Sequence, residues 1–224
     1  MPRAANKPIV CYVTDRKTLG PSDAFRGAVS STVEKIRLAA AAEADWVQVR
    51  EKDLSAKELL ALVTQAVSIG ESRVKVIVND RLDAALAAGA AGVHLGRESV
   101  AVSEVVQWCR AGNAPAELLI GASCHSLDEA RQAEAAGANY AFFGPVFDTP
   151  SKRAFGAPRG IAQLREVCRE IRIPVIAIGG LDQGNAMECL RGGASGIAAI
   201  RLFQENTDAE TLREFVKSVH DAAW

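Results

Sequence analysis

The stretch VKVIVND at Val74–Asp80 decides the fold that the sequence predicts. It is apolar at almost every position, and it ends abruptly in an amide and a carboxylate. A strand that is apolar throughout is buried on both faces, which is typical of a parallel sheet covered by helices. Similar runs follow one another along the chain: Val10–Asp15, Trp46–Glu51, Gly92–Gly96, Leu118–His125, Tyr140–Phe147, Pro174–Gly180 and Gly196–Phe203.

Segments rich in Ala, Leu, Glu and Arg separate these runs and have helical spacing. Ser55 and Ser126 each precede such a segment and are followed three residues later by Glu, which is the spacing of a capping box. Eight strand–helix units predict a (β/α)8 barrel, an α/β fold with parallel strands, and we expect residues 1–224 to form one domain. Active sites of such barrels lie at the C-terminal ends of the strands. The polar ends of the runs are therefore the candidate site.

The composition excludes several classes of partner. A net charge of -1 gives no general attraction to nucleic acid or to an anionic membrane, and no apolar segment is long enough for a secretory signal or a membrane helix. Aromatic residues are only 5%, so we expect Val, Ile, Leu and Ala to fill the core. Five scattered cysteines without a C-x-x-C pair predict buried free thiols in the cytoplasm. Oligomeric state is not readable, and a homo-oligomer stays open.

Basic and amide residues alternate at the end of the second run. Because successive strand residues point to opposite faces, Gln48, Arg50 and Lys52 share one side and Glu51 takes the other. Two cations converging at a barrel mouth are costly unless an anion meets them. We expect either an anion-binding site or a structural layer of ion pairs.

Three further run ends carry candidate polar side chains. Asp80 is a candidate Mg2+ ligand, although the Asn79–Asp80 pair could also cap the next helix. His94 is interpreted as a hydrogen-bonded core residue. Ser123 and His125 lie on one side of their strand, but without a third orienting group they do not predict a catalytic triad.

The last candidates concern phosphate. The irregular stretch 148–159, which reads DTPSKRAFGAPR, is either a loop that closes over phosphate or a solvated charged loop. Barrels often bind phosphate with the loops after strands seven and eight, where Gly179 and Gly180 would let the backbone come close.

Five stretches carry a resemblance to a known family: VQVREKD, VNDRLDAALAAGAAGVHLG, IGASCHSLDEA, FGPVFDTPSK and IPVIAIGG. From Cys11 to Arg201 the chain resembles the thiamine phosphate synthase and thiazole tautomerase family. The resemblance implies a (β/α)8 barrel. It also implies a transferase that joins 4-amino-2-methyl-5-hydroxymethylpyrimidine diphosphate to thiazole phosphate, releasing pyrophosphate. Ionisation of the diphosphate needs metal and bases to absorb charge, and it needs no strong nucleophile.

The resemblance also assigns roles. It implies that Asp80 ligates Mg2+, that Gly179 and Gly180 take the thiazole phosphate, and that Lys152, Ser123 and His125 are the catalytic candidates. The diphosphate would be held by side chains from several run ends: Gln48, Arg50, Lys52, Asn79 and Lys152, with Ser123 and Thr149 nearby.

Two positions depart from the synthase pattern. Ser99 stands where synthases carry Asp as the second metal ligand, and Arg201 stands where they typically carry Ser. Two alternatives stay open for this reason. One is a metal-independent thiazole tautomerase that uses His125 as its acid–base group, and the other is a phosphate-binding paralogue without turnover.

Overall fold

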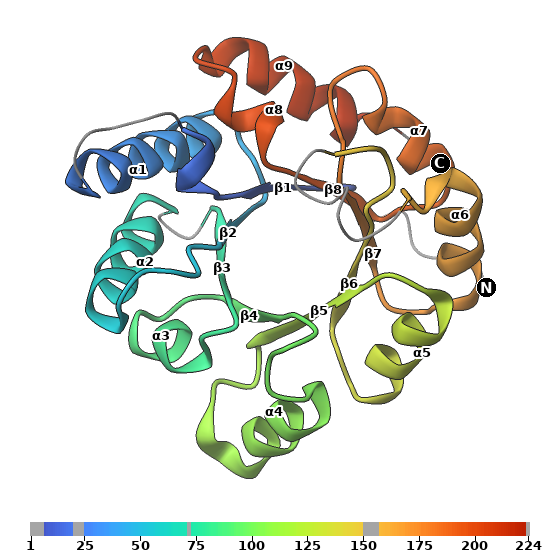
Figure 1. The fold of residues 1–224 in the computed structure, drawn as a ribbon, viewed down its shortest axis with the longest axis horizontal. Coiled ribbons are helices and arrows are strands. Elements are labelled where there is room, and N and C mark those ends of the chain that lie inside the picture. Colours follow the sequence, from blue (N-terminus) through green and yellow to red (C-terminus); the bar gives the residue numbers. More distant parts are fainter. Residues whose placement is uncertain (1–6, 20–24, 71–72, 150–156, 223–224) are drawn as a thin grey trace.

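Eight parallel strands close into a barrel in the computed structural model, which describes residues 7–19, 25–70, 73–149 and 157–222 (Figure 1). Each strand pairs with its neighbours in the chain, and β1 pairs with β8 to close the ring. The strands are β1 (Ile9–Val13), β2 (Trp46–Val49), β3 (Lys75–Asn79), β4 (Gly92–Leu95), β5 (Leu119–Cys124), β6 (Tyr140–Phe143), β7 (Val175–Ile178) and β8 (Gly196–Ala199). The predicted (β/α)8 barrel is confirmed.

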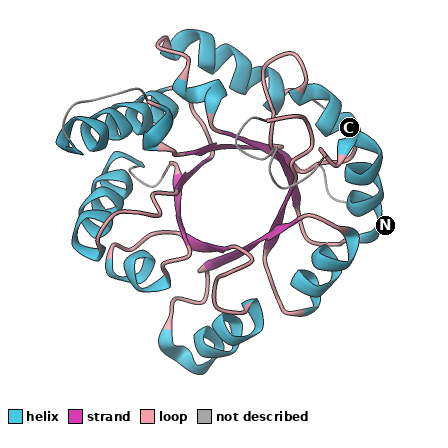
Figure 2. Cartoon of the chain, viewed as in Figure 1, coloured by secondary structure: helices cyan, strands magenta, loops and turns pink. Residues whose placement is uncertain are grey.

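Helices surround the ring of strands on its outside (Figures 1 and 2). They are α1 (Phe25–Ala41), α2 (Ala56–Gly70), α3 (Leu82–Ala87), α4 (Val102–Trp108), α5 (Leu127–Ala135), α6 (Gly160–Glu170), α7 (Ala186–Arg191), α8 (Arg201–Gln204) and α9 (Ala209–His220). Two short helical turns, η1 (Arg16–Thr18) and η2 (Cys109–Asn113), add to them. Within the described ranges, no helix is long and apolar enough to cross a membrane.

The predicted eighth run extends beyond its strand. β8 ends at Ala199, and Arg201–Gln204 forms the short helix α8. The apolar pattern continues because Leu202 and Phe203 are buried by the helix. A short apolar run does not distinguish a strand from a buried helical turn.

The barrel interior is more aromatic than the composition led us to expect. The cluster inside the ring includes Trp46, Tyr140 and Phe142, with the Trp46 and Tyr140 ring centroids 4.8 Å apart. Gly121 makes room for this packing, because a Cβ atom there would overlap the Tyr140 ring. Val, Ile, Leu and Ala make up most of the buried core, as expected, and the interior cluster adds these three aromatic rings to them.

Both predicted helix caps are present. The Ser55 backbone N–H donates to Glu58 Oε2 at 3.0 Å, and the Glu58 N–H donates to Ser55 Oγ at 3.4 Å, which completes a capping box. Ser126 Oγ accepts the Glu129 N–H at 3.1 Å. The Glu129 carboxylate accepts the His125 backbone N–H at 2.6 Å and so fixes the chain at the end of β5.

Removing the second cap should weaken the fold measurably. We expect Ser126→Ala to lower the free energy of unfolding by about 1 kcal/mol, because one N–H at the start of α5 loses its acceptor. Urea denaturation measures the change. Ser103→Ala is the control, since Ser103 is exposed on α4. Equal losses in both variants would contradict the capping role.

Candidate active site

A cavity of about 340 Å³ opens at the C-terminal ends of the strands. It brings together almost all of the predicted catalytic and substrate-binding residues, from five different strand ends: Gln48, Arg50, Lys52, Asn79, Ser123, His125, Thr149, Gly179 and Gly180. Asp80 and Ser99 lie beside it and contact each other. Lys152 falls outside the described residues, as does most of the predicted phosphate loop.

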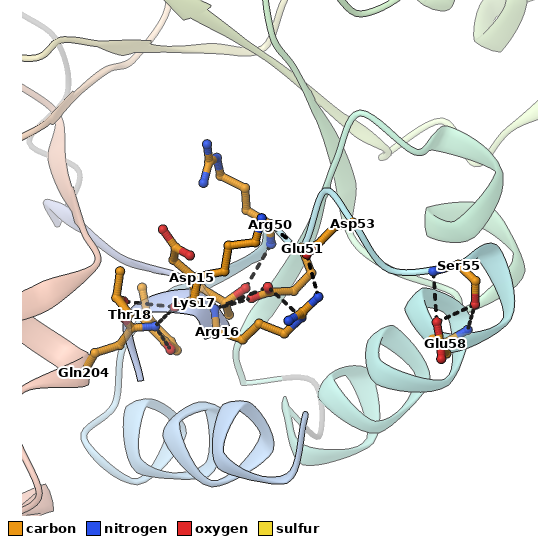
Figure 3. Close-up of polar contacts among 12 residues, drawn as sticks. Asp15, Arg16, Lys17, Thr18, Arg50, Glu51, Asp53, Ser55, Glu58 and Gln204 are labelled. Atoms are coloured by element: carbon orange, nitrogen blue, oxygen red, sulfur yellow. Dashed lines mark hydrogen bonds and ion pairs between the residues drawn. The ribbon is translucent and has the colours of Figure 1, made fainter. Parts of the chain in front are cut away.

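Arg50 reaches the cavity because the residues around it are fixed in alternating directions. Its backbone N–H donates to Thr14 Oγ1 at 3.0 Å. Glu51 turns the other way and accepts the Arg16 backbone N–H at 3.1 Å. Figure 3 shows the Arg50 side chain extending into the barrel opening, away from Glu51 and Asp53. None of the described acidic residues forms an ion pair with Arg50, so the ion-pair layer considered for this strand end does not account for it.

An amide network connects the ends of β2 and β3. The Gln48 Nε2 donates to Asn79 Oδ1 at 2.9 Å, and Asn79 Nδ2 donates to Asp80 Oδ2 at 2.6 Å. An ionised carboxylate only accepts, so Asp80 fixes the orientation of both amides in turn. The remaining oxygen, Gln48 Oε1, is buried and has no partner among the described residues. It is an acceptor available to a ligand in the cavity.

Asp80 does not cap the helix that follows it. The residue before α3 is Arg81, and no side chain caps that helix. The Asp80 backbone has a φ of 63°, a left-handed conformation that Asp tolerates better than most residues. Its carboxylate accepts hydrogen bonds from Ser99 Oγ and from the Gly96 N–H, the latter at 3.3 Å, and Lys52 Nζ lies 3.9 Å away. The capping interpretation of Asp80 is therefore wrong, because its carboxylate accepts hydrogen bonds from Gly96 and Ser99 in the turn after β4.

His94 is a buried core residue, as predicted, although one edge lines the cavity. Its Nδ1 lies 3.2 Å from the Tyr140 hydroxyl and its Nε2 lies 2.9 Å from Ser123 Oγ. Burial lowers the pKa of His94 to about 3, because desolvation disfavours the imidazolium. Ser123 therefore pairs with a neutral imidazole at neutral pH.

The buried imidazole predicts a loss of stability in acid. The pKa of a histidine in the unfolded chain is about 6.5. Below that pH His94 is protonated in the unfolded state but stays neutral in the folded state. Stability is full above about pH 6.5 and falls by about 1.4 kcal/mol per pH unit toward the folded pKa. We expect His94→Gln to be less stable at pH 7 but to lose less on acidification. Urea unfolding at several pH values tests this, and parallel curves for both proteins would contradict it.

His125 faces the same cavity but does not pair with Ser123. Its Nδ1 lies 2.5 Å from the Gly144 carbonyl oxygen, which can only accept, so the Nδ1–H is donated there. Ser123 Oγ is engaged by His94 instead. Ser123 and His125 are thus held by different partners, Ser123 by His94 and His125 by the Gly144 carbonyl.

Glycines shape the opposite wall of the cavity. Gly179 and Gly180 follow β7 with φ values of 96° and 68°. A Cβ atom on Gly180 would lie 2.5 Å from the Asp148 carbonyl oxygen, so only glycine fits. Arg201, the first residue of α8, also lines the cavity here.

The sequence analysis did not single out Asp15, which also lines the cavity. Asp15 ends the first apolar run, so the strand-end rule that identified the other candidates also applied to it. In the described ranges, no three His, Cys, Asp or Glu residues are grouped as they would be in a metal centre.

The fold and the cavity define the class of protein first. A barrel with cations, an amide network and close-approach glycines around one cavity at its strand ends is a barrel enzyme for small anionic substrates.

The comparisons with known proteins then identify the family. The family model for thiamine monophosphate synthase matches residues 21–203. The thiamine-phosphate synthase of Chlorobium phaeobacteroides is 37% identical over 205 residues, covering 91% of this chain and 92% of that protein. The thiamine-phosphate synthase of Methanoculleus marisnigri is 39% identical over 193 residues, covering 84% of each. The structure of thiamine phosphate pyrophosphorylase from Pyrococcus furiosus aligns with a TM-score of 0.78 at 34% identity, over 96% of this chain and 98% of that one. The chain belongs to the thiamine monophosphate synthase family.

Proposed function

We propose that this chain is a thiamine phosphate synthase, which joins 4-amino-2-methyl-5-hydroxymethylpyrimidine diphosphate to thiazole phosphate and releases pyrophosphate. The observation that carries the proposal is the cavity itself. Arg50 and Lys52 stand on one wall, and Gly179 and Gly180 stand on the other, so two phosphorylated substrates have separate places to bind. The family membership supports the same activity.

The basic wall suits a departing diphosphate. In the proposed step the bond between the methylene carbon and the diphosphate oxygen breaks, and its electron pair leaves with pyrophosphate. The lone pair of the thiazole nitrogen then forms the new C–N bond with the pyrimidine-methyl cation. Positive groups placed before the reaction stabilise the charge that develops on the leaving group. No proton is transferred in this step, so the step needs neither Ser123 nor His125 as an acid or a base.

Gln48 is better suited to the pyrimidine than to the diphosphate. One of its two Nε2–H groups is donated to Asn79, and its buried Oε1 has no partner among the described residues. A carbonyl oxygen repels a phosphate but accepts a hydrogen bond from an amino group. We therefore assign Gln48 to the amino group of the aminopyrimidine, and we assign Arg50, Lys52 and Asn79 to the diphosphate side.

The glycine wall suits the thiazole phosphate. Glycine lets the backbone come close to a ligand. Gly179 and Gly180 also have positive φ values, which other residues adopt only with strain. Arg201 adds a cation at the same wall. Thr149 also lines the cavity, one residue after Asp148, whose carbonyl oxygen lies against Gly180, and its hydroxyl can donate to a phosphate there.

The residues beside the cavity fit Mg2+. This ion is commonly bound by one or two carboxylates together with substrate phosphates, and Asp80 supplies one carboxylate beside the Ser99 hydroxyl. Bound Mg2+ would neutralise charge on the diphosphate as it leaves. We propose Asp80 as its carboxylate ligand.

Lys152 is proposed as a further diphosphate ligand from the sequence alone. We expect Lys152→Ala to raise KM for the diphosphate substrate and to lower kcat, together by about 10²-fold in kcat/KM, because a cation that meets the leaving group is lost. Steady-state kinetics measure both constants. Arg153→Ala removes a neighbouring cation and is the control. Unchanged kinetics in Lys152→Ala would exclude the role.

The deciding experiment supplies the purified protein with both substrates and follows pyrophosphate release, first with Mg2+ and then with EDTA. Metal-dependent release with formation of thiamine phosphate would establish the activity. Absence of release, with isomerisation of a thiazole carboxylate phosphate that His125→Ala abolishes, would establish a tautomerase instead. Binding of both substrates without any turnover would point to the non-catalytic paralogue.

We propose further that residues 1–224 act as one domain in the cytoplasm. None of the five cysteines, all of them described by the structure, forms a disulfide, which suits a reducing compartment. Burial of the thiols is confirmed for Cys11, Cys124 and Cys189, whereas Cys109 and Cys168 are partly exposed.

A further inference from the structure

The backbone at Asp15 is held from both sides of β1. Its carbonyl oxygen accepts a hydrogen bond from Gln204 Nε2 at 3.0 Å and another from the Thr18 backbone N–H at 3.1 Å. The next backbone N–H, that of Arg16, donates to both carboxylate oxygens of Glu51, at 3.1 and 3.2 Å. Gln204 belongs to α8 and Glu51 follows β2, so segments on either side of β1 fix this stretch of the chain (Figure 3).

The Asp15 carboxylate has no such partner among the described residues. The two cations that follow it in the chain, Arg16 and Lys17, pair with Asp53 instead, at 2.8 and 3.3 Å. Asp15 lines the cavity, and Figure 3 shows its side chain pointing toward the barrel opening, as the Arg50 side chain does. A carboxylate on a fixed backbone, which no described cation neutralises, presents its negative charge to a ligand in the cavity.

The order of the strands places Asp15 between two basic parts of the cavity wall. In the closed barrel β1 lies between β8 and β2. Arg201 follows β8, Arg50 follows β2, and both line the cavity together with Asp15. The proposed function assigns the thiazole phosphate to the wall with Arg201 and the diphosphate to the wall with Arg50. The carbon and nitrogen atoms that become joined lie between the two phosphorylated ends, on the part of the wall that Asp15 occupies.

A carboxylate at this point is unsuited to phosphate and suited to a cation. It repels both phosphorylated groups, whereas it attracts the positive charge that appears on the methylene carbon when the bond to the diphosphate breaks. The positively charged thiazolium ring of the product forms at the same point. Glycoside hydrolases use a carboxylate in a comparable way, beside a transition state that resembles an oxocarbenium ion.

We propose that Asp15 is a catalytic residue whose carboxylate stabilises the pyrimidine-methyl cation and then the thiazolium ring of the product. The inference rests on the proposed function, since the cation arises only in that reaction. The carbon–oxygen bond breaks and its electron pair leaves on pyrophosphate, after which the lone pair of the thiazole nitrogen forms the new carbon–nitrogen bond. Asp15 neither forms a bond nor moves a proton in these steps.

The binding of two matched ligands tests the charge effect without turnover. One ligand is thiazole phosphate, and the other is the same compound methylated at its ring nitrogen, so that the ring carries a permanent positive charge. In isothermal titration calorimetry of the full chain, we expect the cationic ligand to bind about tenfold more tightly than the neutral one. Asp15→Asn should remove this preference, because it removes the charge and keeps the size of the side chain. The same variant should bind inorganic pyrophosphate several-fold more tightly, because a repulsion is lost.

Steady-state kinetics supply the second readout. We expect Asp15→Asn to lower kcat by about 10²-fold without raising KM for the diphosphate substrate, because the lost charge acts only once the cation forms. Asp15→Glu keeps the charge and should recover part of kcat and part of the preference for the cationic ligand. Tighter pyrophosphate binding combined with slower turnover separates a charge effect from a structural defect, which would weaken both.

Asp53→Asn is the matched control, because it removes the same charge from the same region of the molecule, whereas Asp53 does not line the cavity. It should keep both kcat and the preference for the cationic ligand. An equal preference in Asp15→Asn and the unaltered chain would overturn the inference, as would an equal loss in Asp53→Asn.

Turnover decides between the inference and the function on which it rests. Pyrophosphate release by the unaltered chain, with a kcat that Asp15→Asn leaves unchanged, would overturn the inference and leave the proposed function standing. Absence of pyrophosphate release from the unaltered chain under every condition would overturn both.

Discussion

The Arg50→Gln variant is expected to lose about 10²- to 10³-fold in kcat/KM for the pyrimidine diphosphate, the loss typical of removing one pre-placed electrostatic group. Arg50 lines the cavity, its backbone is fixed by Thr14, and no described acid neutralises it. Its charge is therefore available to the diphosphate. Glutamine keeps much of the length and the polarity of the side chain but removes the charge. Most of the loss should appear in kcat, because charge grows on the leaving group during ionisation.

Steady-state measurement of pyrophosphate release gives both constants for this variant. Arg97→Gln is the matched control, because Arg97 is an exposed cation that follows β4 and does not line the cavity. A loss confined to KM would mean that Arg50 only binds the substrate. Equal activity in Arg50→Gln and Arg97→Gln would contradict a role in charge stabilisation.

The Asp80→Asn variant is expected to lose about 10²-fold or more in kcat/KM and to require more Mg2+ for its remaining activity, because a neutral amide is a poorer ligand for a hard dication. The fold should survive the change. Asp80 has a φ of 63°, and asparagine tolerates this left-handed conformation. The amide oxygen can still accept the hydrogen bond from Asn79.

Titrating Mg2+ against the rate, with thermal unfolding as a check on folding, measures both effects. Asp83→Asn is the control, since Asp83 lies three residues further on, is exposed and pairs only with Arg81 among the described residues. An unchanged Mg2+ requirement in Asp80→Asn would show that the metal is held elsewhere.

Much of the fold could be predicted because the apolar runs are short, β-branched and evenly spaced. The run at Gly196–Phe203 was extended too far, since α8 buries Leu202 and Phe203 as a strand would. The barrel topology then explains why the run ends gathered the candidate residues. Parallel strands bring all their carboxyl ends to one rim, so a residue's position at the end of a strand was sufficient to predict that it lies near the other candidates.

Individual partners could not be predicted in the same way. Ser99 and Asp80 belong to adjacent strand ends, but the bond between them depends on the turn at Gly96, which the sequence does not specify. The free oxygen of Gln48 follows only from the directions of Asn79 and Asp80. Sequence spacing gives the side of a strand, whereas hydrogen-bond direction needs the coordinates.

Gly121 has a consequence for how this protein can diverge. A side chain at Gly121 would overlap the Tyr140 ring, so a mutation there is accessible only to a lineage that has already replaced Tyr140 by something smaller. Losing Tyr140 also removes the hydroxyl beside His94, whose other nitrogen contacts Ser123 at the cavity wall. Substitutions inside the barrel therefore also change the wall of the cavity at the strand ends. The order in which such substitutions arise matters as much as their identity.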